Sequence, residues 1–166
     1  MRGDHLGMSS ARRLGLLWMA AALGGCGRGD WKAETQPAFG EVVINGQPAK
    51  GVIVTLHPKG EAVDVRKSRP WGLTNEKGFY TLRTYESGDG APVGEYQATI
   101  VWKFDPSKQE ETDRLGFAYS KPEKSEWEVS VGEGENLLPK IELSDVKLQD
   151  PPKAKAAGST PFDIVE

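Results

Sequence analysis

Two stretches of the chain decide its fold class: Gly51-Val52-Ile53-Val54-Thr55-Leu56-His57-Pro58 and Glu95-Tyr96-Gln97-Ala98-Thr99-Ile100-Val101-Trp102-Lys103. The first stretch places Val52, Val54 and Leu56 on one side of an extended backbone, because successive side chains of a strand point to opposite faces. The second stretch alternates in the same way and is rich in aromatic and β-branched residues. Both stretches are therefore predicted to be strands that turn one face toward a core.

Turn signals separate further strand-like segments on both sides of these two. Asn45-Gly46 is the strongest short hairpin signal, and Asn75-Glu76-Lys77-Gly78 is typical of a turn. The 20 glycines and 11 prolines also favour many turns. We expect strands at 38–44, 51–57, 71–74, 79–85, 95–103, 127–131 and 137–143, with a weak edge strand around 63–65. No long helix is indicated. The sequence thus predicts an all-β fold, a seven-stranded antiparallel β-sandwich over residues 38–146.

The core of this sandwich is expected to come from the apolar faces of the later strands. The expected core residues are Tyr80, Leu82, Tyr96, Ile100, Trp102, Trp127, Val129, Ile141 and Leu143.

Charge and cysteine content exclude several classes of protein. The net charge of −3 argues against nucleic acid as a partner. A single cysteine excludes a disulfide framework and a cysteine zinc cage, and two histidines leave little for histidine-based catalysis. The stretch Glu86 to Glu95 carries carboxylates around Asp89 but lacks the spacing of a calcium loop, so we expect a solvated turn and no metal site.

The N-terminus is predicted to be an export signal. Arginines at positions 2, 12 and 13 precede the ten-residue apolar run 14–23, which has the length of a signal-peptide core and about half of what a membrane-spanning helix needs. Leu23-Gly24-Gly25-Cys26 resembles the lipobox of bacterial lipoproteins, which implies cleavage before Cys26 and acylation of its thiol, with palmitate among the acyl chains. Plain secretory cleavage or an uncleaved anchor are the alternatives. Arg12-Arg13 also fits a twin-arginine signal, but an ordinary basic region is the preferred interpretation because nothing in the sequence requires export in the folded state. Met8 is an alternative start.

Four regions follow from these features: a signal peptide at 1–25, the lipidated Cys26 with a flexible linker at 26–37, the β-sandwich domain at 38–146, and a disordered tail at 147–166. Removing the signal takes away three arginines and one aspartate, which leaves a net charge of −5. The body of the protein is therefore expected to sit on a tether and not to bind an anionic membrane electrostatically.

The motifs within 40–102 resemble the carboxypeptidase regulatory-like domain, also called transthyretin-like or prealbumin-like. The resemblance rests on Gly46-Gln47-Pro48, the strand ending at Pro58, Thr74-Asn75-Glu76-Lys77-Gly78 and Gly94-Glu95-Tyr96. With the lipobox, the layout is similar to small lipoproteins of planctomycete-type bacteria. This implies a transthyretin-like or Ig-like sandwich that is exported and lipid-anchored to a bacterial membrane, on its periplasmic or surface face.

Two enzyme classes use related folds, and neither pattern is present. Metallocarboxypeptidases carry this module beside a zinc domain, for which the chain has neither room nor the His-x-x-Glu motif. Hydroxyisourate hydrolases use several histidines and end in Tyr-Arg-Gly-Ser, whereas only His57 follows the signal peptide here. The chain is therefore expected to be non-enzymatic and to need no cofactor.

Aromatic residues in or near loops are the remaining candidate ligand contacts. Trp71, Tyr85 and Tyr119, with Phe117 as a further candidate, could stack on sugar rings, or they could close the ends of the sandwich. The preferred function is a membrane-anchored structural or protein-interaction module of the cell envelope. The alternative is a module that binds an envelope polysaccharide through these aromatics, so the expected partners are the membrane and an envelope protein or glycan.

Overall fold

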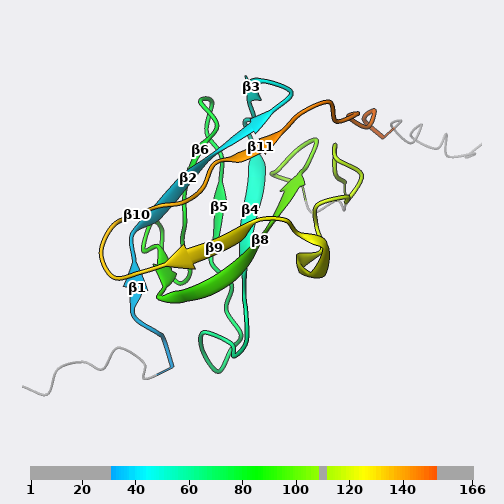
Figure 1. Ribbon diagram of the computed structural model, residues 1–166. Helices are drawn as coiled ribbons and strands as arrows, with labels where there is room; N and C mark the ends of the chain where they lie inside the picture. The colour runs from blue at the N-terminus through cyan, green and yellow to red at the C-terminus, as the bar shows by residue number, and fades with distance from the viewer. Residues whose placement is uncertain (1–30, 109–111, 153–166) are drawn as a thin grey trace, which may run out of the picture.

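The computed structural model describes residues 31–108 and 112–152, and it confirms the all-β prediction (Figure 1). One 3-10 turn, η1 (Pro122–Lys124), is the only helical element in those ranges. The described residues form eleven short strands where about seven were expected, because three two-residue strands lie outside the expected segments and the strand expected at 137–143 is divided in two. They are β1 (Thr35–Gln36), β2 (Ala38–Ile44), β3 (Gln47–Pro48), β4 (Val52–Pro58), β5 (Trp71–Leu73), β6 (Phe79–Thr81), β7 (Ala91–Pro92), β8 (Gly94–Trp102), β9 (Glu128–Val131), β10 (Asn136–Leu137) and β11 (Ile141–Leu143).

The two stretches that decide the fold class lie side by side at the centre of a four-stranded sheet. β4 pairs antiparallel with β8 from Val52↔Trp102 to Pro58↔Tyr96, and the sheet order is β5-β4-β8-β9. Val52, Val54 and Leu56 of β4 are fully buried, as the alternation predicts. Burial of these side chains on one face supplies the main favourable term for this sheet.

The second sheet is organised around β2. The Asn45-Gly46 hairpin is confirmed: both residues have positive φ, at 53° and 75°, and β2 pairs antiparallel with β3 across them. This is the geometry of a two-residue type I′ turn, which asparagine and glycine adopt most easily. β6 pairs antiparallel with another part of β2.

The C-terminal strands differ from the antiparallel arrangement that was expected. β10 and β11 both pair parallel with β2. The expected single strand at 137–143 is divided, because Pro139 lacks an amide hydrogen for the ladder. After β9 the chain turns and crosses to the sheet of β2, so it runs alongside that strand in the same direction.

The two main sheets join at one corner and share one core. Trp71 of β5 and Arg83, just after β6, exchange two backbone hydrogen bonds of 2.9 and 2.8 Å. Buried side chains of β2, β4, β6, β8, β9 and β11 form a single cluster, which gives the fold its sandwich-like character. Of the expected core residues, Trp102 and Trp127 are only partly buried at its margin.

Two loops depart from their expected conformation. The weak strand expected at 63–65 is a turn, because the Asp64 carboxylate accepts hydrogen bonds from the amides of Arg66 (2.8 Å) and Ser68 (3.1 Å). The long loop after β8 is held by Asp113, whose buried carboxylate accepts bonds from the amides of Trp102, Leu115 and Phe117.

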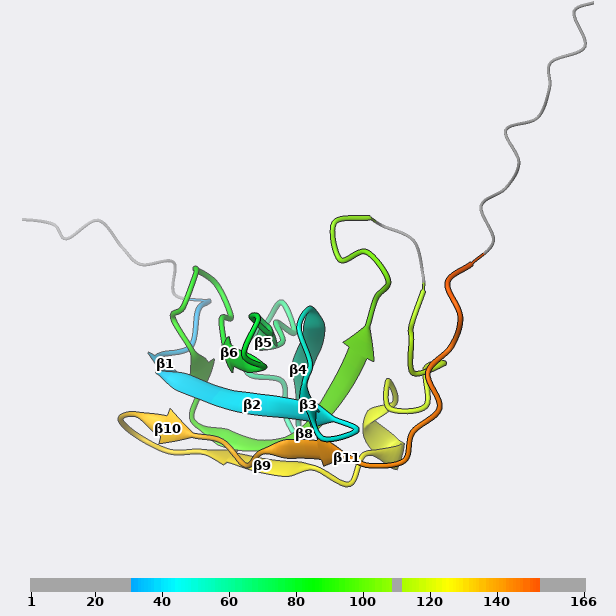
Figure 2. The same ribbon diagram turned by 90° about the horizontal axis from the view of Figure 1, so that it is seen from above.

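The two ends of the described chain lie at opposite ends of the molecule. β1 and the loop between β4 and β5 are at one end, and β3 with the segment after β11 is at the other (Figures 1 and 2). Val146 confirms the second placement, because its amide and carbonyl bond the side chain of Asn45 in the β2–β3 hairpin.

Candidate functional site

An open pocket of about 450 Å³ lies where the N-terminal segment meets the domain. Its walls are the segment 32–35 on one side and the loop residues Tyr85, Glu86 and Asp89 on the other. We call residues 31–36 the N-terminal strap. Part of the linker expected at 26–37 is therefore docked against the domain: the strap includes β1, which pairs antiparallel with β7.

Tyr85 is the residue that fastens the strap. Its hydroxyl accepts a hydrogen bond of 3.0 Å from the amide of Ala33 and donates one of 2.8 Å to the Asp64 carboxylate. Its ring meets the ring of Trp31 edge-on at 5.4 Å between centroids, a favoured geometry for aromatic pairs. Tyr85 thus joins three segments of the chain: the strap, the 64–68 turn and its own loop.

The charges of this site are arranged to hold the backbone. Burial and the bond to Asp64 raise the pKa of the Tyr85 phenol, so it stays protonated and can donate. Partial burial acts to raise the pKa of Asp64, but hydrogen bonds from Ser68, Tyr85 and Arg66 outweigh it and lower this pKa. Asp64 is consequently ionised at neutral pH and accepts three hydrogen bonds.

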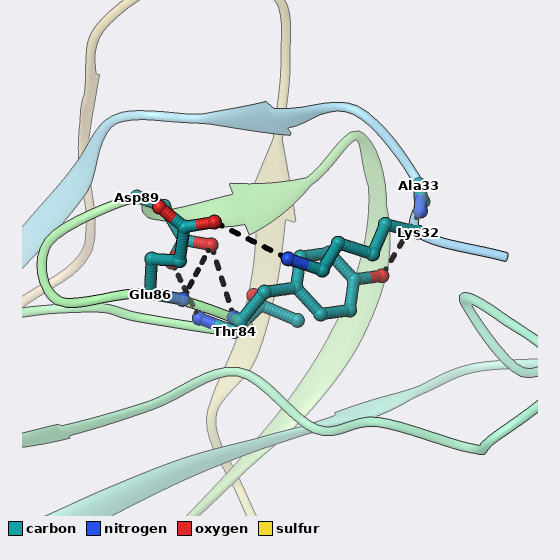
Figure 3. Close-up of polar contacts among 6 residues, drawn as sticks. Lys32, Ala33, Thr84, Glu86 and Asp89 are labelled. Carbon is teal, nitrogen blue, oxygen red and sulfur yellow. Dashed lines mark hydrogen bonds and ion pairs between the residues drawn. The ribbon is translucent and has the colours of Figure 1, made fainter. Parts of the chain in front are cut away.

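Asp89 shapes the loop that carries Tyr85. Its carboxylate accepts bonds from the amides of Thr84 (2.7 Å), Tyr85 (3.0 Å) and Glu86 (3.0 Å). Figure 3 shows this carboxylate beside the backbone of its own loop, with Lys32 reaching across to Glu86 at 3.2 Å. The oxygens of Asp89 therefore already accept hydrogen bonds from amides, and this structural role explains the carboxylate without calcium.

The chemistry of the site is that of a clamp. Asp64 and Asp89 both accept hydrogen bonds from backbone amides, and Asp64 also accepts one from the Tyr85 hydroxyl. Across residues 31–108 and 112–152, no three His, Cys, Asp or Glu side chains gather as metal ligands. This arrangement fixes the point at which the N-terminal strap leaves the domain.

The three aromatics proposed as ligand contacts lie in three different settings. Trp71 lies in β5 with the Arg83 guanidinium 4.2 Å from its ring centroid. Tyr119 packs on Trp127 at 5.6 Å between centroids. Tyr85 belongs to the clamp described above. Each ring is therefore engaged by another side chain, and the structure does not bring the three together.

The structure also describes His57 and Phe117, two further residues that the sequence singled out. His57 lies within hydrogen-bond distance of Thr99, with 2.9 Å between its Nε2 and the hydroxyl oxygen. Burial lowers the pKa of His57, and the positive charge of Arg69 lowers it further. The negative charge of Glu123 raises this pKa but does not outweigh them, so the ring is neutral at pH 7. Phe117 is 46% exposed in the loop after β8, where φ is 60°.

An exposed apolar stripe crosses the outer face of the sheet built on β2. Leu137 of β10 lies opposite Phe39 of β2. On the other side of β2, Thr81 of β6 pairs with Phe39, and Phe79 of β6 pairs with Glu41. Phe79 is therefore diagonal to Phe39. Leu137 is 77% exposed and Phe79 is 49% exposed. Sequence reasoning missed this stripe, since the register of the parallel strand β10 cannot be read from local alternation.

The anchor residues lie beyond the described part of the chain. The signal peptide at 1–25, Cys26 and most of the tail at 147–166 fall in ranges that the structure does not describe. In the described ranges, no helix combines the length and the hydrophobicity that a bilayer crossing requires.

No protein-family model matches the sequence, and the search of curated proteins found no match.

Proposed function

We propose that this chain is a lipid-anchored, non-enzymatic domain of the bacterial cell envelope that acts as a structural or protein-interaction module. In its finer form, the fold is a seven-stranded sandwich of the carboxypeptidase regulatory-like type, with the short strands and parallel C-terminal pairings as local variations. The Asn45-Gly46 hairpin and the two sheets with a shared core support this form. The basic and apolar stretches before Cys26, together with Cys26 as the one cysteine of the sequence, support the anchor.

The observation that carries the interaction role is the apolar stripe of Phe39, Phe79 and Leu137. Leu137 and Phe79 are exposed and Phe39 between them is half-buried; apolar side chains in this setting are costly to keep in water, and such patches mark contact surfaces. Around the stripe, Glu41 and Thr81 provide a polar border on the same face. A small apolar centre with a polar rim is the usual composition of a protein–protein contact.

A photo-cross-linking experiment tests this role in the envelope. The photoreactive analogue benzoylphenylalanine at position 79 preserves an aromatic ring there, and the same analogue at Leu73 is the matched control. Leu73 is similarly exposed, at 45%, but lies on the other sheet. We expect a discrete cross-linked protein species from position 79 that is absent from position 73 and is lost when Leu137→Ser is added. Equal yields from both positions, or no dependence on Leu137, would contradict the proposal.

The polysaccharide alternative receives no support from the placement of the aromatics. Trp71, Tyr85 and Tyr119 each pack against another side chain, so they offer no common platform for a sugar. Glycan binding that disappears in a Trp71→Ala variant would nevertheless favour this alternative over a protein partner.

A further inference from the structure

The docked strap shortens the tether between the domain and the anchor. Only five peptide units separate Cys26 from Trp31, and five residues span at most about 18 Å. Trp31 is fixed to the domain by Tyr85 and by Arg66, whose guanidinium lies 3.7 Å from the centroid of the Trp31 ring. If Cys26 is acylated, the end of the domain that carries Trp31 must therefore stay within about 18 Å of the lipid attachment point.

The loop beside Trp31 presents residues suited to a membrane surface. Val65 is 83% exposed at the tip of this loop, and Arg66 and Lys67 are exposed beside it. Neither cation forms an ion pair with another part of the chain that the structure describes. Tryptophan rings and basic side chains favour the headgroup region, where an apolar side chain can also leave water.

Of the carboxylates at this end, Glu86 is paired with a cation, whereas Asp64 keeps its negative charge. Asp64 accepts bonds from two backbone amides and from Tyr85, and Glu86 pairs with Lys32. Glu34 and Glu61 are exposed nearby and reduce the attraction. Because these carboxylates offset much of the charge of Arg66 and Lys67, the surface suits only a weak contact that orients a domain already held by its anchor.

We propose that Trp31, Val65, Arg66 and Lys67 form a surface that rests on the anionic phospholipid headgroups of the membrane holding Cys26. This inference depends on the lipid anchor of the proposed function. It adds an orientation: the β1 end faces the bilayer, while the β3 end and the C-terminal segment point away from it. The apolar stripe on the side of the domain then remains accessible to a partner.

A labelled, membrane-extracted protein in vesicles tests the orientation. Val65→Cys adds one thiol for an environment-sensitive dye, because the Cys26 thiol is blocked by acylation, and Lys147→Cys is the matched position at the other end. The vesicles contain about one-third phosphatidylglycerol in phosphatidylcholine, with nitroxide-headgroup lipid as quencher. We expect the dye at position 65 to be quenched at least threefold more than the dye at position 147.

Charge reversal supplies the control for specificity. Arg66→Glu with Lys67→Glu is expected to reduce quenching at position 65 to the level of position 147. Lys77→Glu with Lys147→Glu makes the same charge change at the opposite end and is expected to leave quenching at position 65 unchanged. Equal quenching at both label positions, or equal effects of both double variants, would overturn the proposed orientation.

The same vesicles separate failure of the orientation from failure of the anchor. An acylated protein that floats with vesicles but shows no preferential quenching at position 65 refutes only the membrane-facing surface. A protein that does not float at all, and whose intact mass shows no lipid on Cys26, refutes the anchor of the proposed function and the orientation with it.

Discussion

Replacing Gly90 by alanine is expected to release the N-terminal strap from the domain. A Cβ atom at Gly90 would lie 1.8 Å from the carbonyl oxygen of Gln36, and φ there is +86°. Alanine in this backbone region costs about 1–2 kcal/mol, and the overlap with Gln36 must be relieved by moving β1 away from β7. Hydrogen exchange measured by mass spectrometry should show the amides of 33–36 exchanging at least tenfold faster.

Gly88 provides a matched control in the same loop. Its φ is +75°, but a Cβ there would have no atom within 4 Å. Gly88→Ala should therefore destabilise the loop by the backbone cost alone, about 1–2 kcal/mol, and leave exchange in the strap close to that of the parent protein. Similar exchange in the two variants would mean that the strap is not held in the way the contacts at Gly90 indicate.

Leu56→Ala is expected to lower the free energy of unfolding by about 2–5 kcal/mol, the usual range for truncating a fully buried leucine. Leu56 lies in β4, between β5 and β8, where the surrounding strands limit collapse into the space left behind. Because small domains have total stabilities of about 5–15 kcal/mol, this loss should be large in urea denaturation.

Leu73→Ala is the control for this change. Leu73 belongs to the neighbouring strand β5 but points outward and is 45% exposed, so its truncation should cost less than about 1 kcal/mol. If the two variants lost similar stability, the assignment of the inner and outer faces of this sheet would be incorrect.

Local alternation was sufficient to predict the long strands. The strand predicted at 38–44 coincides with β2, and those predicted at 51–57 and 95–103 differ from β4 and β8 by one residue at each end. These strands have one buried face, which imposes a period of two on the sequence. Asn45-Gly46 identified its turn because few other residues adopt positive φ at both positions.

Pairing between distant segments could not be predicted in the same way. β10 and β11 run parallel to β2, a partner about one hundred residues earlier, and no short pattern specifies that neighbour. β1 and β7 have two residues each, too few to show periodicity. A weak edge strand was expected at 63–65, where Val63 and Val65 alternate, but the tendency of Asp64 to bind nearby amides makes this segment part of a turn.

The candidate site was predictable only in part. Tyr85 was selected from its loop position, but its partner Trp31 lay in a segment expected to be flexible linker. A lone tryptophan in a polar segment was the available signal, and it did not indicate which loop would receive the ring. Trp71 and Tyr119 were selected by the same reasoning, and both pack within the domain surface because their neighbours Arg83 and Trp127 converge on them only in the folded chain.

The most direct test of the account is the intact mass of the protein extracted from membranes, measured beside a Cys26→Ser variant. We predict that the extracted protein has lost residues 1–25 and gained the mass of a diacylglycerol and an acyl chain, and that this gain requires Cys26. A soluble mature chain without added mass would contradict the lipid anchor, and the proposed membrane-facing end would fall with it.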